Sequence, residues 1–281
     1  MNNLLQGFFG RSPKKIRSRE DLMSDFRSAR KVSAQGLHAQ ALPMYRKLAD
    51  DGLSEAQWAL GFMYYQGLGV SVNGKEAIRW LRMAADQGNL EAMNIIGKIY
   101  MDGCGVHESC SEAASWYRRA AEQGSLTGKF NLATCYLGGL GVPKDNRRGL
   151  ETLLEIADQG SDTAQVFLGD LRFEGRILKQ DGEEALRWYV NAAERGNHVG
   201  QFKAGMFFAE GKYVKRNRAL ALRFLILAAD GGFPGAIEAT KRLRAEMTDA
   251  EMQDTIAMLQ NWKPITGKEP AFVLSPDVFK R

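Results

Sequence analysis

The stretch AQWALGFMYYQGLGV at residues 56–70 decides the fold, because close variants of it recur along the chain at a fixed distance. Its next copy, AMNIIGKIYMDGCGV, occupies residues 92–106, which is 36 residues later. A glycine that closes an apolar helical stretch keeps the same spacing at Gly52, Gly88, Gly124, Gly160, Gly196 and Gly232. A constant period of this length is typical of a solenoid, in which each unit covers the apolar face of its neighbour.

The first half of each unit has the pattern of an amphipathic helix. Ala56, Leu60 and Tyr64 are spaced four residues apart and therefore form one apolar stripe. Gly61 interrupts this helix and recurs in later units, which predicts close approach of another helix, since glycine otherwise lowers helix stability by about 1 kcal/mol. Gly67 ends the helix and begins a tight turn.

The second half of each unit predicts another helix, which runs antiparallel to the first. Residues 77–87 carry a bulky ring at Trp80 and a small pair at Ala84 and Ala85, and this arrangement returns in later units. Residue types that cap helix N-termini precede the helix at Asn73, Ser109, Asp145 and Asp181.

These motifs resemble the Sel-one-like repeat, a relative of the tetratricopeptide repeat. The resemblance implies an all-α solenoid, a right-handed superhelix of antiparallel helix pairs. Five repeats are expected at residues 56–91, 92–127, 128–163, 164–199 and 200–235. The last two depart from the pattern in the turn, where Arg176-Ile177 and Lys212-Tyr213 replace Leu-Gly.

The remaining segments predict caps and tails. We expect a degenerate helix pair at residues 20–55 and capping helices at residues 236–262, where Thr248 and Glu251 form a capping-box pattern. Residues 1–19 form a basic leader and residues 263–281 a tail, both expected to lack fixed structure until bound.

Composition argues against several functional classes. Residues 1–31 hold eight basic and three acidic side chains, which is the whole net charge of +5, so the repeats lack the basic face of a nucleic-acid binder. No apolar run reaches the length of a membrane span, and no secretory signal is evident. Three cysteines leave one unpaired, which favours a reducing compartment and predicts a cytoplasmic protein. We also expect a monomer from a bacterium, because repeat arrays of this kind are common in bacteria.

The sequence predicts no catalytic centre and no cofactor. A match to most of a phosphate-binding loop at residues 69–75 lacks the Ser or Thr that binds magnesium. Cys104, His107 and Cys110 have metal-ligand spacing, but the repeat explains these positions as an ordinary turn, and we expect no metal. With three histidines and no carboxylate pair placed in one cleft, general acid–base catalysis lacks candidates.

A non-catalytic scaffold that binds a partner protein is therefore the predicted function. Side chains on the face of the first helix opposite its apolar stripe should line a concave surface and receive a peptide or helix of the partner. These candidates are Trp58, Phe62, Tyr65, Asn94, Lys98, Met101, Phe130, Thr134, Asp170, Phe173, Phe202 and Met206. Phe62 and Met206 should point furthest from the core. Packing between adjacent first helices is the competing interpretation for much of this set.

Two alternatives remain open at the level of sequence. One is a secreted effector or an immunity-type inhibitor with one dedicated partner, since such roles occur among Sel-one-like proteins. The other is a membrane-tethered adaptor, because the leader combines apolar anchors with basic residues at Leu4, Leu5, Phe8, Phe9, Arg11, Lys14 and Lys15.

Overall fold

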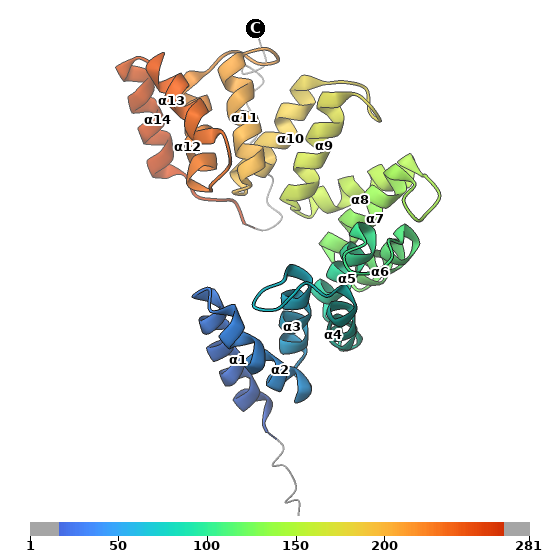
Figure 1. Ribbon diagram of the computed structural model, residues 1–281. Coiled ribbons are helices and arrows are strands. Elements are labelled where there is room, and N and C mark those ends of the chain that lie inside the picture. Colours follow the sequence, from blue (N-terminus) through green and yellow to red (C-terminus); the bar gives the residue numbers. More distant parts are fainter. Residues whose placement is uncertain (1–16, 267–281) are drawn as a thin grey trace, which may run out of the picture. The chain divides into compact units, whose positions relative to one another are not determined.

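The computed structural model describes residues 17–266 and shows an all-α chain of paired helices, as predicted (Figure 1). Contacts divide the chain into two compact units, Met1–Gly128 and Lys129–Arg281, with the boundary inside helix α7 (Leu126–Gly138). Each unit is described by itself.

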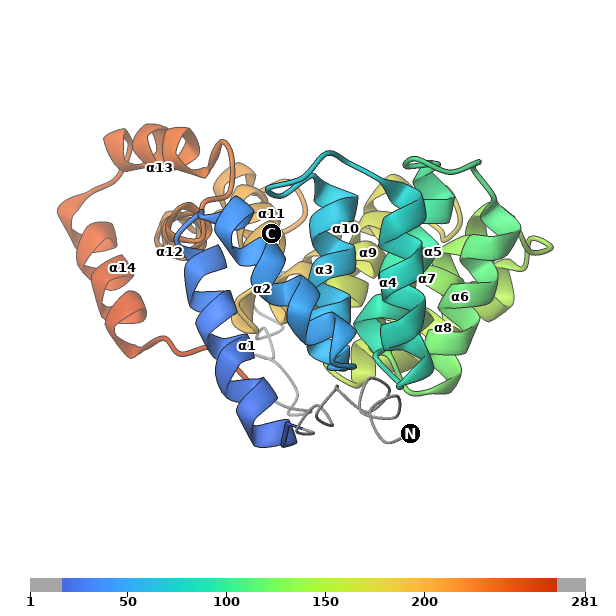
Figure 2. The same cartoon turned by 60° about the horizontal axis from the view of Figure 1, so that its bottom comes forward.

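Unit 1 consists of three helix pairs joined by short turns (Figure 2). Consecutive helices pack against each other, and their apolar stripes share one core that includes Leu48, Leu60, Leu81 and Ile96. The helices are α1 (Arg19–Ala34), α2 (His38–Asp50), α3 (Ser54–Gln66), α4 (Gly74–Asp86), α5 (Leu90–Asp102) and α6 (Cys110–Glu122).

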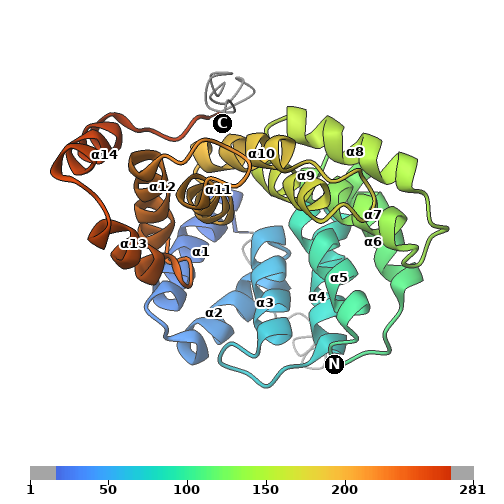
Figure 3. The same ribbon diagram turned by 90° about the horizontal axis from the view of Figure 1, so that it is seen from above.

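Unit 2 continues the pairing and ends in two capping helices (Figure 3). Tyr189, Phe208 and Phe224 are among the large side chains fully buried in its core. The helices after α7 are α8 (Asn146–Asp158), α9 (Asp162–Glu174), α10 (Gly182–Glu194), α11 (His198–Glu210), α12 (Arg218–Asp230), α13 (Ala236–Ala245) and α14 (Asp249–Asn261).

The predicted helix ends are confirmed. The side chains of Asn73, Ser109, Asp145 and Asp181 each accept a hydrogen bond from a backbone N–H in the first turn of the helix they precede. Gly67 ends α3 in the left-handed conformation at a φ of 73°. These caps satisfy backbone groups that a helix end leaves without partners.

The glycine inside α3 confirms the expected close approach of two helices. A Cβ on Gly61 would stand 2.6 Å from Cγ of Leu81 on α4, the partner helix of the same pair. Gly97 and Gly169 have the same relation to the rings of Tyr117 and Tyr189. In each of these three pairs the first helix thus needs a missing side chain where the second crosses it.

The second glycine of the turn has a role that the sequence reading missed. A Cβ on Gly69 would stand 2.5 Å from the backbone nitrogen of Ala39, at the start of α2 in the preceding pair. Gly105 approaches the start of α4 in the same way, 2.6 Å from the nitrogen of Gly74. The turn of each of these pairs therefore packs directly on the backbone of the pair before it.

Buried glutamines also join successive pairs. Gln57, Gln165 and Gln201 occupy equivalent repeat positions and are at most 4% exposed. Each side-chain amide donates to a carbonyl near the end of the preceding helix, at 3.0 to 3.2 Å, and the acceptors are Ala49, Ala157 and Ala193. A buried amide is stable only when it is hydrogen-bonded, so these glutamines are structural.

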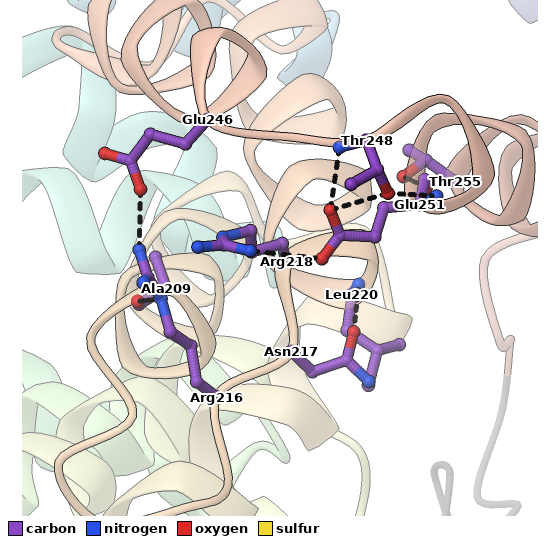
Figure 4. A network of polar contacts seen from close by, with 9 residues as sticks. All are labelled: Ala209, Arg216, Asn217, Arg218, Leu220, Glu246, Thr248, Glu251 and Thr255. Carbon is purple, nitrogen blue, oxygen red and sulfur yellow. Dashed lines mark hydrogen bonds and ion pairs between the residues drawn. The ribbon is translucent and has the colours of Figure 1, made fainter.

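A polar network fastens the capping helices to α12 (Figure 4). Arg216 pairs with Glu246 at 2.8 Å, and Arg218 pairs with Glu251 at 3.4 Å. Glu251 also accepts from the backbone nitrogen of Thr248 at 2.8 Å, which confirms the predicted capping box. The buried hydroxyl of Thr255 reaches the carbonyl of Ala219 at 3.4 Å.

Candidate interaction surfaces

Three aromatic rings in unit 1 form a continuous row along one face of α3. Phe62 stacks on Trp58 with a centroid distance of 5.7 Å and meets the edge of Tyr65 at 6.4 Å. All three side chains are half-buried, whereas the intervening Leu60 and Met63 are buried in the core. The helix thus keeps an aromatic surface in contact with solvent in addition to its core stripe, and we call these three residues the α3 aromatic row.

Helix α5 places polar groups beside the end of this row. Lys98 is exposed and pairs with Asp102 at 2.8 Å, and the hydroxyl of Tyr65 lies 3.5 Å from the same carboxylate. The Asn94 amide donates to the carbonyl of Leu90 at 3.0 Å and to the hydroxyl of Ser125 at 2.9 Å. Asn94 therefore connects α5 with Ser125, the residue before α7.

The surroundings of Tyr65 and Lys98 change the pKa values of both side chains. Burial raises the pKa of the Tyr65 hydroxyl, and the hydrogen bond to Asp102 raises the pKa of the Lys98 ammonium. Tyr65 is therefore neutral and Lys98 charged at neutral pH. The row ends in a hydrogen-bonding hydroxyl and an ion pair, which gives an apolar surface with a polar rim.

Unit 2 carries an aromatic cluster around Phe173. Phe173 is 39% exposed and contacts the rings of Phe207 at 5.5 Å and Tyr213 at 6.3 Å. The ring of Tyr213 covers Gly182 at the start of α10, where the earlier pairs use the second glycine of the turn. The sequence reading noted the departure at Lys212-Tyr213 but did not identify Phe207 or Tyr213 as members of a surface.

Asp170 is a junction between helices in unit 2 and not a free carboxylate. It accepts from the hydroxyl of Tyr189 at 2.6 Å and forms an ion pair with Lys203. Burial raises the pKa of Tyr189, and the hydrogen bond to the Asp170 carboxylate raises it further. The network connects α9, α10 and α11, and the Tyr189 ring also contacts Phe207 of the Phe173 cluster at 5.6 Å.

The other candidates of unit 2 are partly exposed and make contacts within the unit. Phe130 meets the ring of Phe167 at 5.6 Å, and Phe202 stacks on Phe233 at 4.6 Å. Thr134 donates to the carbonyl of its own helix at Asn131, 2.7 Å away. These contacts agree with the alternative that part of the set serves packing.

Met206 differs from Phe62, although both were expected to point furthest from the core. Met206 is half-buried and packs against the core of unit 2. Phe173 is the more exposed apolar side chain of this unit.

The cysteine and histidine cluster is a turn. None of the three cysteines, all of which lie within residues 17–266, forms a disulfide, and Cys110 lies 3.8 Å from the sulfur of Met101. The ring of His107 contacts the backbone carbonyl of Glu108 at 2.7 Å. In the part of the chain from residue 17 to 266, no group of three or more His, Cys, Asp or Glu is placed to hold a metal ion.

Two predictions concern membranes. The leader residues Leu4, Leu5, Phe8, Phe9, Arg11, Lys14 and Lys15 lie outside the described residues. Among the described helices, none has both the length and the apolar character that a membrane span requires.

A model of the Sel1 repeat family matches five segments that together make up more than half of the chain. The chain therefore belongs to the Sel1 repeat family, as its motifs indicated. The matched segments are residues 54–89, 90–125, 128–161, 163–197 and 198–233. No curated protein matches the chain at a significant level.

Solved structures support the same assignment. A Sel1 repeat protein from Oxalobacter formigenes is 26% identical with a TM-score of 0.64, and the match covers 83% of this chain and 98% of that one. A protective antigen present in uropathogenic Escherichia coli strains, which displays an SLR fold, is 29% identical with a TM-score of 0.53. The match covers 78% of this chain and 48% of the antigen, so this chain spans about half the antigen's length.

An immunity protein from Pseudomonas aeruginosa, Pa5087, shares the fold. It is 17% identical with a TM-score of 0.55, over 75% of this chain and 81% of that one. Sel1 repeat proteins generally bind other proteins, and their fold is typically a non-catalytic scaffold.

Proposed function

We propose that this protein is a non-catalytic adaptor that binds segments of partner proteins at two separate surfaces, the α3 aromatic row of unit 1 and the Phe173 cluster of unit 2. A reducing, cytoplasmic setting is part of the proposal, and it is supported by three cysteines that form no disulfide among the described residues. The partner segment is expected to be an extended peptide or an amphipathic helix with apolar anchors.

The observation that carries the proposal is the position of Phe62. Its ring lies between Trp58 and Tyr65 and remains partly exposed, whereas Leu60 and Met63 of the same helix are buried in the core. A large apolar ring that its neighbours already hold in place is suited to contact an apolar side chain of a partner. Little conformational entropy is lost when such a ring binds.

The test is quantitative capture of partners from a lysate of the source cell by the full chain. We expect Phe62→Ala to reduce capture of the main partner at least about tenfold, as removal of a hot-spot ring typically does. Met83→Ala is the matched control, because Met83 is 41% exposed on α4 and lies outside the α3 aromatic row.

Both variants must keep the wild-type melting temperature within a few degrees. Equal capture by the wild type and Phe62→Ala would overturn the proposal. One stoichiometric partner in the wild-type sample favours a dedicated inhibitor, and several weak partners favour a general adaptor.

A further inference from the structure

The end of α10 carries a buried carboxylate whose partners come from two distant parts of the chain. Glu194 is 5% exposed, and both its oxygens accept from the guanidinium of Arg223, at 2.9 and 2.8 Å. Arg223 is itself 7% exposed on α12. Such a two-pronged pair fixes the orientation of the carboxylate without help from other residues.

The chain returns to this carboxylate after α14, and we call residues 262–265 the strap (Figure 3). The indole nitrogen of Trp262 donates to Oε2 of Glu194 at 2.8 Å, and the backbone nitrogen of Ile265 donates to the Glu194 carbonyl at 2.8 Å. Pro264 lies over the turn at Gly196, where a Cβ would be 3.8 Å away. The strap therefore binds in an extended form, as a peptide ligand would.

The same position in the other pairs is acidic but exposed. Asp50, Asp86, Glu122, Asp158 and Asp230 end or nearly end their helices at the equivalent repeat position. Only at Glu194 does a chain segment cover the acidic residue within residues 17–266. Burial of this carboxylate is thus a property of the Glu194 site and not of the repeat.

The strap is attached independently of the helix before it. Helix α14 is held on α12 by Thr255 and by the ion pair of Arg218 with Glu251. The strap adds two hydrogen bonds and the contact of Pro264 to this arrangement, and Lys263 and Pro264 are exposed. Release of the strap therefore does not require α14 to leave its place.

We propose that Glu194, Gly196 and Arg223 form a peptide-binding site that the strap occupies as an internal ligand, and that a partner segment of the same chemistry displaces it. The segment has a tryptophan, whose N–H reaches the carboxylate, and a backbone N–H three residues later that reaches the helix-end carbonyl. This inference deepens the proposed adaptor function and rests on it, since it names the chemistry of a bound segment.

The test uses a fluorescein-labelled peptide, Asn-Trp-Lys-Pro-Ile-Thr, and measures its binding to the full chain by fluorescence polarisation. In the wild type the strap competes from the same molecule, at an effective concentration on the order of millimolar. Trp262→Ala removes the strap's anchor and is expected to bind the peptide at least about tenfold more tightly than the wild type. Lys263→Ala is the matched control and should bind like the wild type.

Two further arms keep the test independent of folding. Trp262→Phe keeps an aromatic ring but lacks the indole N–H, so this variant should also bind the peptide more tightly than the wild type does. It replaces Trp262→Ala if circular dichroism shows that Trp262→Ala is unfolded. A peptide with phenylalanine in place of tryptophan should bind the opened chain at least about fivefold more weakly, because it lacks a hydrogen bond to a charged acceptor.

The proposal is overturned if the opened chain shows no saturable binding up to about 1 mM peptide, the upper range of such effective concentrations. It is also overturned if the two peptides bind equally, or if the Trp262 variants bind no more tightly than Lys263→Ala. None of these outcomes depends on Phe62, so the adaptor function would be tested separately.

Discussion

The same substitution at two equivalent glutamines should change stability in opposite directions. Gln57 uses both ends of its amide, since it donates to the carbonyl of Ala49 at 3.2 Å and accepts from Gln87 at 2.8 Å. Gln165 donates to Ala157 at 3.0 Å, but its buried Oε1 has no hydrogen-bond partner among the described residues. Methionine is the natural replacement, because Met93 occupies this position, fully buried, in one of the two repeats between them.

The magnitudes follow from the bonds that each substitution removes. Gln57→Met removes two buried hydrogen bonds, each contributing about 1 kcal/mol, so it should lower the free energy of unfolding by about 2 kcal/mol. Gln165→Met removes one such bond but also a buried acceptor without a partner, whose desolvation penalty is about 1 to 3 kcal/mol. The carbonyl of Ala157 keeps a backbone donor from Gly160 at 3.0 Å. Gln165→Met should therefore be neutral or stabilising by about 1 kcal/mol.

The assay is urea unfolding followed by circular dichroism, with hydrogen exchange of the repeats on either side of each substitution. Hydrogen exchange is needed because repeat arrays often unfold in parts, and a single midpoint then hides a local change. Equal destabilisation by the two substitutions would refute the reasoning, since it would mean that the hydrogen-bond partners of each glutamine do not determine its contribution.

Four other substitutions test the packing and the caps. Gly169→Ala places a Cβ 2.5 Å from a buried ring on α10 and should destabilise the protein by about 1 to 3 kcal/mol in thermal unfolding, despite the better helix propensity of alanine. Gly182→Ala should be destabilising by a similar amount, and Tyr213→Gly in the same chain should recover at least about 1 kcal/mol, which a double-mutant cycle measures. The backbone hydrogen bond from Thr248 lowers the pKa of Glu251. The ionised Glu251 carboxylate therefore contributes to the stability of the fold above about pH 4, and this contribution is lost as the pH falls through the lowered pKa. The stability difference between Glu251→Gln and the wild type should accordingly shrink in urea unfolding below about pH 4.

The period predicted the helices and their caps because both depend on residues close in the chain. Asn73 precedes its helix by one residue, and Gly67 ends the one before it. Contacts between successive pairs were harder to predict. Gln57 and Gly69 occur in the repeat pattern, but which atoms they approach depends on how one pair packs on the next.

The third repeat shows how a departure from the pattern can preserve the packing. The sequence has Ala133 where the other four repeats have a glycine. In the structure the glycine has moved to the partner helix, where a Cβ on Gly149 would lie 3.0 Å from the carbonyl of Ala133. In the first repeat, a Cβ on Gly61 would lie at the same distance from the carbonyl of Ala77. The crossing needs one glycine, and either helix can supply it.

The same reasoning separates structural positions from those open to function. Gly61, Gln57 and Gly69 each have a contact within the repeats that accounts for the residue type. Phe62 has no comparable explanation, because its ring contacts only other members of the α3 aromatic row among the ring pairs of the described residues and stays partly exposed. A repeat protein can vary such a position without loss of the fold, so we expect the side chain found there to reflect what the surface binds.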